Sequence, residues 1–527
     1  MVTGVQTCAL PICVLEACFM RSGAGRASVI QEDLGGLFMV TNDATILKIK
    51  HEVLYRVAKL AYEGKFQEER EKIPYEMIPG PKAQFRCCIY KEREVIRQRV
   101  NLAEGKTPMG EIPDNSKGHK IVYVIPAACE ECPIARYTVT NNCQNCMGKA
   151  CYNSCNFGAI TIGMNQAYID PSKCKECGKC AAACPYNAIA DLMRPCRKSC
   201  PVDALQVDPD TGIAMIDDEK CISCGQCIHS CPFGAIGSVT YIVDIINAMR
   251  EGKKVYAMVA PALEGQFGDK ITMASLKKAA KEIGFTDMIE LGLGGDLTAL
   301  FEAREWAEAY KEGKQLTTSC CPGFVNMVKK HFPKIADHVS TTVSPMCAVS
   351  RMVKAKDPDA ITVFVGPCVA KKSEAADSGI EGNADYVLTI GEFRAMMKAK
   401  DVELEQVEND YQQASVFGKR FGNSGGVTNA VLESLKEENE NADVTVTVCN
   451  GAAECKKALL MLQAGKLKTD FIEGMACVGG CVGGPSKHKS EIETKRFRDK
   501  LIKEADGRNI LENLSEVDLD SFSMYRH

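Results

Sequence analysis

The sequence predicts two structural parts, an α+β region built around cysteine motifs and, after it, an α/β domain. Two observations predict this order. Of the 29 cysteines, 16 lie between Cys129 and Cys231, mostly in C-x2-C spacings that are typical of metal sites. After Gly237 the composition changes to short apolar runs that alternate with helical stretches, which favours parallel sheets covered by helices.

Composition excludes several classes of function. A chain of 527 residues, 46% hydrophobic and 25% charged, has room for about two or three globular domains. Its net charge of -4 gives no reason to expect nucleic acid or an anionic membrane surface as a partner. No run approaches the roughly 18 apolar residues of a membrane span. Because clustered C-x2-C cysteines indicate metal-bound rather than oxidised thiols, we expect a reducing, cytoplasmic compartment.

The first residues are expected to be foreign to the natural protein. The string VTGVQTCALPI, residues 2–12, matches a translated sequencing adapter, so we interpret residues 1–12 as an artefact. They have no basic n-region and no convincing cleavage site of a signal peptide. Residues 1–38 are therefore given no role, and a natural start near Met39 is expected.

Residues 39–120 are predicted to form an N-terminal helical region. Apolar residues recur at three-to-four spacing from Ala44 to about Glu71, which indicates an amphipathic helix. A charged helix is expected from Glu92 to Glu104, ending at Gly105.

Residues 121–240 carry the densest signal. Two runs have the spacing C-x2-C-x2-C-x3-C-P of bacterial ferredoxins, and a third set has the looser spacing C-x2-C-x4-C-x3-C without the proline. Zinc ribbons do not repeat triple-cysteine runs ending in Cys-Pro. The three sets predict a ferredoxin-like α+β region with three 4Fe-4S clusters: Cys174, Cys177, Cys180 and Cys184; Cys221, Cys224, Cys227 and Cys231; Cys143, Cys146, Cys151 and Cys155.

Four cysteines of this region remain, namely Cys129, Cys132, Cys196 and Cys200. Because Cys200 is followed by PVDAL, it resembles the end of another ferredoxin motif, and the four can complete a fourth cluster. The pairing of cysteines with clusters stays open at this stage, since the last cysteine of one ferredoxin run ligates the cluster of the other run.

Residues 241–527 are predicted to form the α/β domain. Helices are expected at 271–283 and 297–312, and a glycine turn at 421–431 opens another helix and lets the backbone pack closely. Buried strands are expected at 255–260, 287–292, 361–366, 386–390 and 444–448.

Three stretches of this domain carry further cysteines: TTSCCPGF (317–324), GPCVAKKSE (366–374) and EGMACVGGCVGGP (473–485). Neighbouring side chains diverge, so a metal centre takes only one of the adjacent Cys320 and Cys321, and the other thiol is free to carry protons. The alternative is an inert buried pair. Together the stretches supply enough thiolates for one cubane cluster: Cys321, Cys368, Cys477 and Cys481.

As a set, these stretches resemble the active-site signatures of the iron-iron hydrogenases. The resemblance covers about residues 124–526 and implies an H-cluster, in which a 4Fe-4S cluster shares one cysteine sulfur with a two-iron unit carrying CO, cyanide and a dithiolate. Cys481 corresponds to that shared sulfur and Cys320 to the proton donor. Lys371 corresponds to a lysine that hydrogen-bonds cyanide, and Glu302, Glu305 and Ser340 fall where the family places proton-relay groups.

The resemblance implies reversible interconversion of protons plus electrons and dihydrogen, with electrons relayed by the ferredoxin-type clusters. Ferredoxin is then the expected electron partner, and hydrogenase maturation proteins are expected to install the two-iron unit. Gly366, Phe324 and the short ending CVGGP depart from the best-studied members and resemble the branch called group B. Two alternatives stay open: a dihydrogen sensor, and an iron-sulfur assembly or scaffold protein of the prelamin-recognition type.

Overall fold

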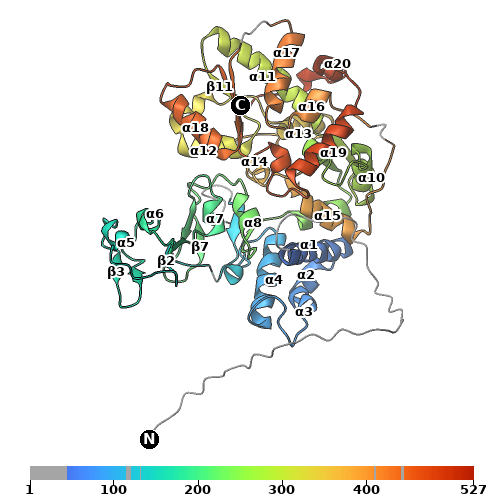
Figure 1. Cartoon of the computed structure of the whole chain (residues 1–527). Helices are drawn as coiled ribbons and strands as arrows, with labels where there is room; N and C mark the ends of the chain where they lie inside the picture. The colour runs from blue at the N-terminus through green and yellow to red at the C-terminus, as the bar shows by residue number, and fades with distance from the viewer. Residues whose placement is uncertain (1–43, 114–119, 131, 409–410, 441–443, 527) are drawn as a thin grey trace, which may run out of the picture. The chain divides into compact units, whose positions relative to one another are not determined.

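In the computed structural model, residues 44–113, 120–130, 132–408, 411–440 and 444–526 are described, so the interpretation of residues 1–38 lies outside them. The chain begins with helices, as predicted, and α1 packs against α15 (Ile390–Ala399) (Figure 1). The first helix is shorter than expected because Gly64, at φ 76°, ends it in a left-handed conformation. These helices are α1 (Ala44–Glu63), α2 (Phe66–Glu69), α3 (Ile73–Met77) and α4 (Ile89–Ala103).

The iron-sulfur region consists of short antiparallel strand pairs and helices of one or two turns. The pairs β2-β5 and β3-β4 lie in sequence between β1 and β6, and the pairs β1-β8 and β6-β7 enclose them. An inner unit, with strands β2 to β5, is therefore inserted into an outer unit, with strands β1 and β6 to β8. The strands are β1 (Val122–Val124), β2 (Tyr137–Val139), β3 (Ile160–Ile162), β4 (Ala167–Ile169), β5 (Ile189–Asp191), β6 (Leu205–Val207), β7 (Ala214–Ile216) and β8 (Ile236–Ser238); the helices are α5 (Ala150–Asn153), α6 (Lys179–Ala183), α7 (Pro195–Lys198) and α8 (Gln226–Ser230).

The α/β domain has two parallel sheets, as the alternation predicts. Their strand orders are β10-β9-β12-β13 and β11-β15-β14. The sequence did not predict β11, which has two residues, or β15, which contains Glu473 and Gly474. The strands are β9 (Val255–Val259), β10 (Asp287–Glu290), β11 (Leu316–Thr317), β12 (Ile361–Gly366), β13 (Tyr386–Thr389), β14 (Val446–Asn450) and β15 (Phe471–Met475).

Helices cover both sheets, and α11 lies beside α16 and α17 (Figure 1). Helix α11 begins at Gly292, five residues before the expected start, because its glycines are packing positions rather than a turn. A Cβ on Gly294 would lie 2.5 Å from the Pro345 carbonyl oxygen. The remaining helices are α9 (Ile242–Arg250), α10 (Met273–Glu282), α11 (Gly292–Lys311), α12 (Pro322–His331), α13 (Pro345–Lys356), α14 (Lys371–Ala375), α16 (Val416–Arg420), α17 (Gly426–Glu437), α18 (Ala452–Gln463), α19 (Glu491–Lys503) and α20 (Ile510–Leu514).

Among the described residues, no helix combines the length and the apolar composition needed to cross a membrane.

A buried ion pair ties the end of the iron-sulfur region to the α/β domain. The Lys372 ammonium donates to Glu392 Oε1 and to the Val239 carbonyl, both at 2.6 Å. The same Glu392 accepts from the Thr389 amide at the start of α15. Both charges are almost fully buried, so neither can be left without the other at low cost.

We expect Lys372→Met to lower the free energy of unfolding by about 3–5 kcal/mol, since it leaves the Glu392 carboxylate buried and unpaired. Lys372→Met/Glu392→Gln should recover much of this loss. The matched control is Lys436→Met, which breaks a pair whose lysine side chain is 76% exposed, and should cost less than about 1 kcal/mol. Denaturant unfolding measures all three, and equal losses for the two lysine variants would contradict the assignment.

Candidate metal centre

The cysteines of the three α/β-domain stretches lie where strands end or helices begin. Cys321 is the N-cap of α12, with Pro322 in the first turn, Cys368 follows β12, and Cys477 and Cys481 follow β15. Loops at the carboxyl ends of parallel strands converge, so this topology brings the thiols together.

These thiols influence one another electrostatically. Burial, reinforced by the negative charge of the other thiolates, raises the pKa of Cys368 to about 12 and that of Cys481 to about 11. The pKa of Cys477 is also raised, by burial first and then by Cys368, Cys321 and Cys481. Four soft sulfur donors that lie close enough to influence one another fit a cubane iron-sulfur cluster, whose iron would stabilise them as thiolates.

The geometry does not suit a single metal ion. In the described part of the chain, no group of three or more His, Cys, Asp or Glu side chains is arranged to hold one ion. A single ion needs all its ligands within about 2.0–2.3 Å, whereas a cubane carries its four thiolates on separate irons and spaces them more widely.

Glycines make room beside Cys477 and Cys481. The Cys481 amide donates to the Gly422 carbonyl at 2.7 Å. Gly480 has φ 79°, and a Cβ there would lie 2.5 Å from the same carbonyl oxygen. The predicted close packing of the 421–431 glycine turn is confirmed, because a Cβ on Gly426 would lie 2.1 Å from the Arg420 carbonyl oxygen.

Lys371 is buried beside the thiols. Its ammonium donates to Glu374 Oε2 at 2.6 Å, to Ser344 Oγ at 2.8 Å and to the Cys320 carbonyl at 3.3 Å. Burial alone would lower the pKa of Lys371, but the Glu374 carboxylate outweighs it and the pKa lies above its ordinary value. The side chain is therefore a fixed positive charge facing Cys320 and Cys368.

Cys320 is a buried, protonated thiol. Burial raises its pKa well above the ordinary value, and the nearby Glu302 charge adds to this effect. Glu302 is itself buried, with one oxygen 3.3 Å from the Ser319 amide; its other oxygen has no hydrogen-bond partner among the described residues. Burial and the Glu305 charge raise the pKa of Glu302 to about 8. Both groups thus hold protons near neutral pH.

Glu305 is anchored rather than placed on a solvated face. It accepts five hydrogen bonds from residues 340–342, including one of 2.6 Å from Ser340 Oγ. The Ser340 hydroxyl also interacts with Glu302. The structure therefore places Glu305 and Ser340 in contact and Glu302 and Cys320 close by, and their role as a proton relay stays a prediction.

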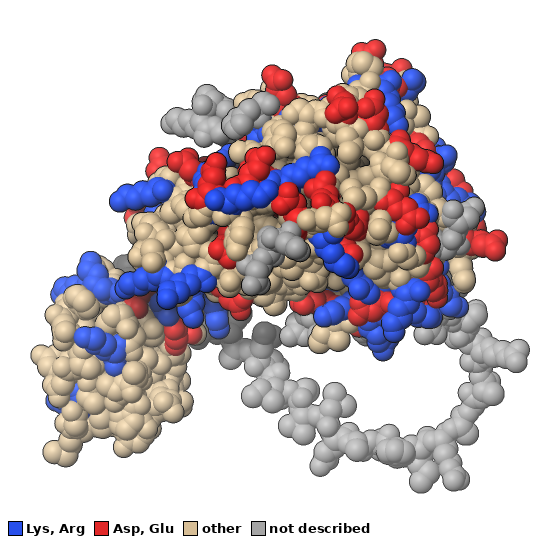
Figure 2. All heavy atoms as spheres, turned by 90° about the horizontal axis from the view of Figure 1, so that it is seen from above, with Lys and Arg blue, Asp and Glu red and all other residues tan. Residues whose placement is uncertain are grey.

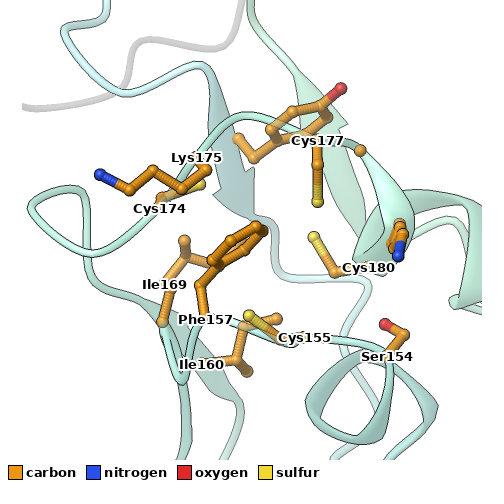
Figure 3. Close-up of a pocket in the computed structure, with 13 residues that line it drawn as sticks. Ser154, Cys155, Phe157, Ile160, Ile169, Cys174, Lys175, Cys177 and Cys180 are labelled. Atoms are coloured by element: carbon orange, nitrogen blue, oxygen red, sulfur yellow. The ribbon is translucent and has the colours of Figure 1, made fainter.

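The inner iron-sulfur unit has two cysteine-lined pockets, and Figure 3 shows one of them. Each holds the first three cysteines of one run and the last cysteine of the other. In one pocket the thiols of Cys155, Cys177 and Cys180 point toward a common space. This is the crossed arrangement of two-cluster ferredoxins. The two sets are Cys174, Cys177, Cys180 and Cys155, and Cys143, Cys146, Cys151 and Cys184.

The outer unit repeats the crossing. The negative charge of Cys200 contributes to raising the pKa of Cys221, Cys224 and Cys227. The pKa of Cys196 is raised in part by the charges of Cys231, Cys129 and Cys132. Cys200 also matches the last cysteines of the two full ferredoxin runs. Each accepts an amide hydrogen bond from the alanine four residues later: Ala188 to Cys184 at 3.4 Å, Ala204 to Cys200 at 3.3 Å, and Ala235 to Cys231 at 3.2 Å.

The outer unit contacts the cysteines of the α/β domain directly. The Cys224 charge acts on Cys477, and Gln226 Nε2 lies 3.8 Å from Cys477 Sγ. A Cβ on Gly225 would lie 2.9 Å from Val369, the residue after Cys368. The cysteine set of Cys200 and Cys221 is thus next to the cysteine set of the α/β domain.

Comparison with known families assigns both halves. Residues 253–485 match the iron only hydrogenase large subunit, C-terminal domain. This region is therefore similar to the C-terminal domain of iron-only hydrogenases. Residues 167–190 match a 4Fe-4S binding domain, and residues 189–242 match the LdpA Fe-S cluster-binding domain. The chain therefore has a 4Fe-4S-binding region followed by an iron-hydrogenase α/β domain, as the sequence predicts.

The individual proteins to which this chain is similar include both hydrogenases and a protein of another name. Iron hydrogenase 1 of Clostridium pasteurianum is 27% identical over 392 residues, covering 63% of this chain and 68% of that protein. The nuclear prelamin A recognition factor of Homo sapiens is 24% identical over 278 residues, covering 42% of this chain and 61% of that protein. A solved FeFe-hydrogenase from Chlamydomonas reinhardtii is 24% identical, with TM-score 0.43, over 50% of this chain and 88% of that chain.

Sequence reasoning missed an arginine near the thiols of the α/β domain. Arg498 is fully buried in α19, and its guanidinium donates to the Pro261 and Lys419 carbonyls and to Asn423 Oδ1. Its charge acts on Cys481. It lies 17 residues beyond Cys481 in a charged helix, so no spacing or motif marks it. Ser344 and Glu374, which fix Lys371, were also missed.

The raised pKa of Glu302 predicts a pH effect on stability. The folded protein keeps this proton up to pH about 8, whereas an unfolded chain loses it near the ordinary 4.5, so stability should fall as the pH rises through this window. Glu302→Gln carries no titrating proton there. The free energy of unfolding of this variant, relative to the wild type, should therefore rise with pH by up to about 1.4 kcal/mol per pH unit. Its thermal midpoint should rise relative to that of the wild type in the same direction.

Scanning calorimetry across that window measures the effect. The matched control is Glu308→Gln, at an exposed position of the same helix, for which the difference from the wild type should stay flat. A flat difference for Glu302→Gln as well would mean that Glu302 is already ionised in the folded protein.

Proposed function

We propose that the protein is an iron-iron hydrogenase that interconverts protons plus electrons and dihydrogen. One observation carries this proposal. The four thiols of the set that includes Cys321 lie close to a fifth, protonated thiol at Cys320 and to the buried ammonium of Lys371. A site for a cluster alone needs only the four thiols. The additional thiol, cation and carboxyl chain support proton delivery next to a redox centre.

The proposed cofactor is an H-cluster held by Cys321, Cys368, Cys477 and Cys481. When bound, its two-iron unit supplies the dihydrogen chemistry. The Lys371 ammonium, fixed by Glu374 and Ser344, would stabilise an anionic ligand of that unit in a dry pocket. Arg498 would add a second positive charge near Cys481.

Proton delivery is the proposed role of the carboxyl chain. Glu305 accepts a proton at the outer end, Ser340 passes it to Glu302, and Cys320 presents it to the centre. Burial keeps Glu302 and Cys320 protonated near neutral pH, so each can donate and then be refilled.

Electrons are proposed to pass through four ferredoxin-type clusters held by the crossed cysteine sets. The set of Cys200, Cys221, Cys224 and Cys227 would be the last before the H-cluster, because it lies against Cys477. We propose the limits 39–120, 121–240 and 241–527 for the helical, ferredoxin-like and catalytic parts, with ferredoxin as electron partner and maturation proteins as installers of the two-iron unit in a cytoplasmic setting.

The group B assignment is part of the proposal. At Gly366 a Cβ would lie 2.5 Å from the Phe364 ring, and at Gly474 it would lie 2.2 Å from the Phe324 ring. Two phenylalanines thus occupy the space at the variant motif positions, which supports a pocket shaped differently from that of the best-studied branch.

The alternatives are an assembly factor or a dihydrogen sensor. The likeness to the prelamin A recognition factor favours the first, but it covers only 42% of this chain. A scaffold would not need the protonated Cys320 beside a fixed Lys371. A sensor needs slow or no proton turnover, which the complete chain from Glu305 to Cys320 disfavours.

Matured with the hydrogenase maturation proteins, the protein should show infrared bands of iron-bound CO and cyanide and evolve dihydrogen from a reduced mediator. Cys320→Ala should keep the bands and iron content but lose about 100- to 10,000-fold in turnover, because only proton delivery is removed. Cys321→Ser should lose the centre. Absent bands alongside a matured control enzyme would favour the scaffold alternative.

Iron content tests the cluster assignment. Five cubanes predict about 20 irons per chain before the two-iron unit is added. A double Cys→Ser variant should lose one cluster if both cysteines hold the same cluster, and two clusters if they hold different ones. Cys143→Ser/Cys184→Ser, within one crossed set, should remove about four irons, and Cys174→Ser/Cys184→Ser, across two sets, about eight. Reversed losses would refute the crossed pairing.

A further inference from the structure

One edge of the inner iron-sulfur unit is open to solvent. Of the sixteen cysteines of the iron-sulfur region, all of which the structure describes, only Cys177 is exposed. It lines the pocket of Cys155, Cys174 and Cys180. Electron transfer falls off steeply with distance, so this is the cluster position that an external carrier can approach most closely.

The surroundings of Cys177 carry unbalanced positive charge. The acidic residues between Tyr137 and Asp191 are all in ion pairs: Asp170 with Lys173, Glu176 with Arg197, and Asp191 with Arg136. Among the described residues, Lys175 and Lys179 have no carboxylate partner within ion-pair distance, and both line the Cys177 pocket. The amino end of Lys175 points away from the thiols (Figure 3).

Apolar side chains accompany these lysines. Phe157 lines the same pocket and is 48% exposed. Met147 and Met164, in the same small unit, are 98% and 95% exposed. Figure 2 shows blue patches on a mostly tan surface over the lobe at its left. A surface of exposed apolar groups rimmed by uncompensated lysines is typical of a docking site for an acidic protein.

We propose that the face formed by Phe157, Lys175, Cys177 and Lys179 docks a small acidic protein that carries a one-electron iron-sulfur centre. Carboxylates of the carrier would pair with the two lysines, and its apolar cluster edge would cover Phe157. One electron then leaves the carrier's centre, which is oxidised, and enters the cluster of Cys155, Cys174, Cys177 and Cys180, which is reduced; no bond forms or breaks. The inference deepens the proposed function, because it identifies where that route begins.

The test follows reduction of the iron-sulfur clusters in the full chain, reconstituted without the two-iron unit. The probe is a reduced bacterial two-cluster ferredoxin of strongly negative net charge, mixed by stopped flow at low ionic strength. We expect Lys175→Glu/Lys179→Glu to lower the second-order rate constant about tenfold or more and to flatten its dependence on salt. Phe157→Ala should lower it as well.

Two controls isolate docking from other effects. Lys314→Glu/Lys466→Glu changes two exposed lysines of the α/β domain and gives the same change in net charge, so its rate constant should stay within about twofold of the wild type. Reduction by the small mediator methyl viologen should not slow in Lys175→Glu/Lys179→Glu. Equal slowing in both double variants, or equal slowing with ferredoxin and viologen, would overturn the proposal.

Because the readout is cluster reduction, the experiment is independent of dihydrogen chemistry. A protein that fails to evolve dihydrogen but shows the lysine-dependent rate would refute the proposed function and keep the docking face. A protein that evolves dihydrogen from reduced viologen, but whose reduction by ferredoxin does not depend on Lys175 and Lys179, would support the proposed function and refute the docking face.

Discussion

The close approach of the thiols of Cys321, Cys368, Cys477 and Cys481 is the constraint on which the cysteine site of the α/β domain depends. Burial and the negative charge of neighbouring thiolates raise the pKa of Cys368, Cys477 and Cys481. Iron bonds and a nearby cation are the means of compensating such charge in a dry interior. The strand ends bring the thiols together, the glycines at 422 and 480 let their loops touch, and Glu374 and Ser344 hold Lys371 where its charge is needed.

The sequence could predict what depends on local pattern. Apolar runs gave the buried strands β9, β10, β12 and β13, and cysteine spacing gave the cluster motifs. It could not predict β15, because Glu473 and Gly474 interrupt the apolar pattern; the structure shows that this carboxylate is buried and accepts from Gly425 and Thr428. The hydrogen bonds that anchor Glu305 and the placement of Arg498 depend on segments distant in sequence, which no single-helix pattern contains.

Cluster pairing shows the same limit more sharply. The runs around Cys174 and Cys221 can be recognised as motifs from their spacing. The fourth cysteine of each cluster set comes from another run, however, and the fold determines which one. Cys132 and Cys196 are 64 positions apart in the sequence, and only the fold shows that a complete unit lies between them. The outer unit provides the contact with the hydrogenase-type domain, and the inner unit provides the solvent-exposed cysteine.

The nested arrangement has a consequence for how such chains change over evolutionary time. Tyr137 and Asp191 face each other as partners in the β2-β5 ladder, so the inner unit enters and leaves the outer one at a single place. A segment whose two ends meet can be acquired or discarded as one cassette, leaving the host strands β1, β6, β7 and β8 with their pairing intact. The number of cysteine sets that precede the α/β domain then becomes an inherited variable that is separable from the cysteine set around Cys321.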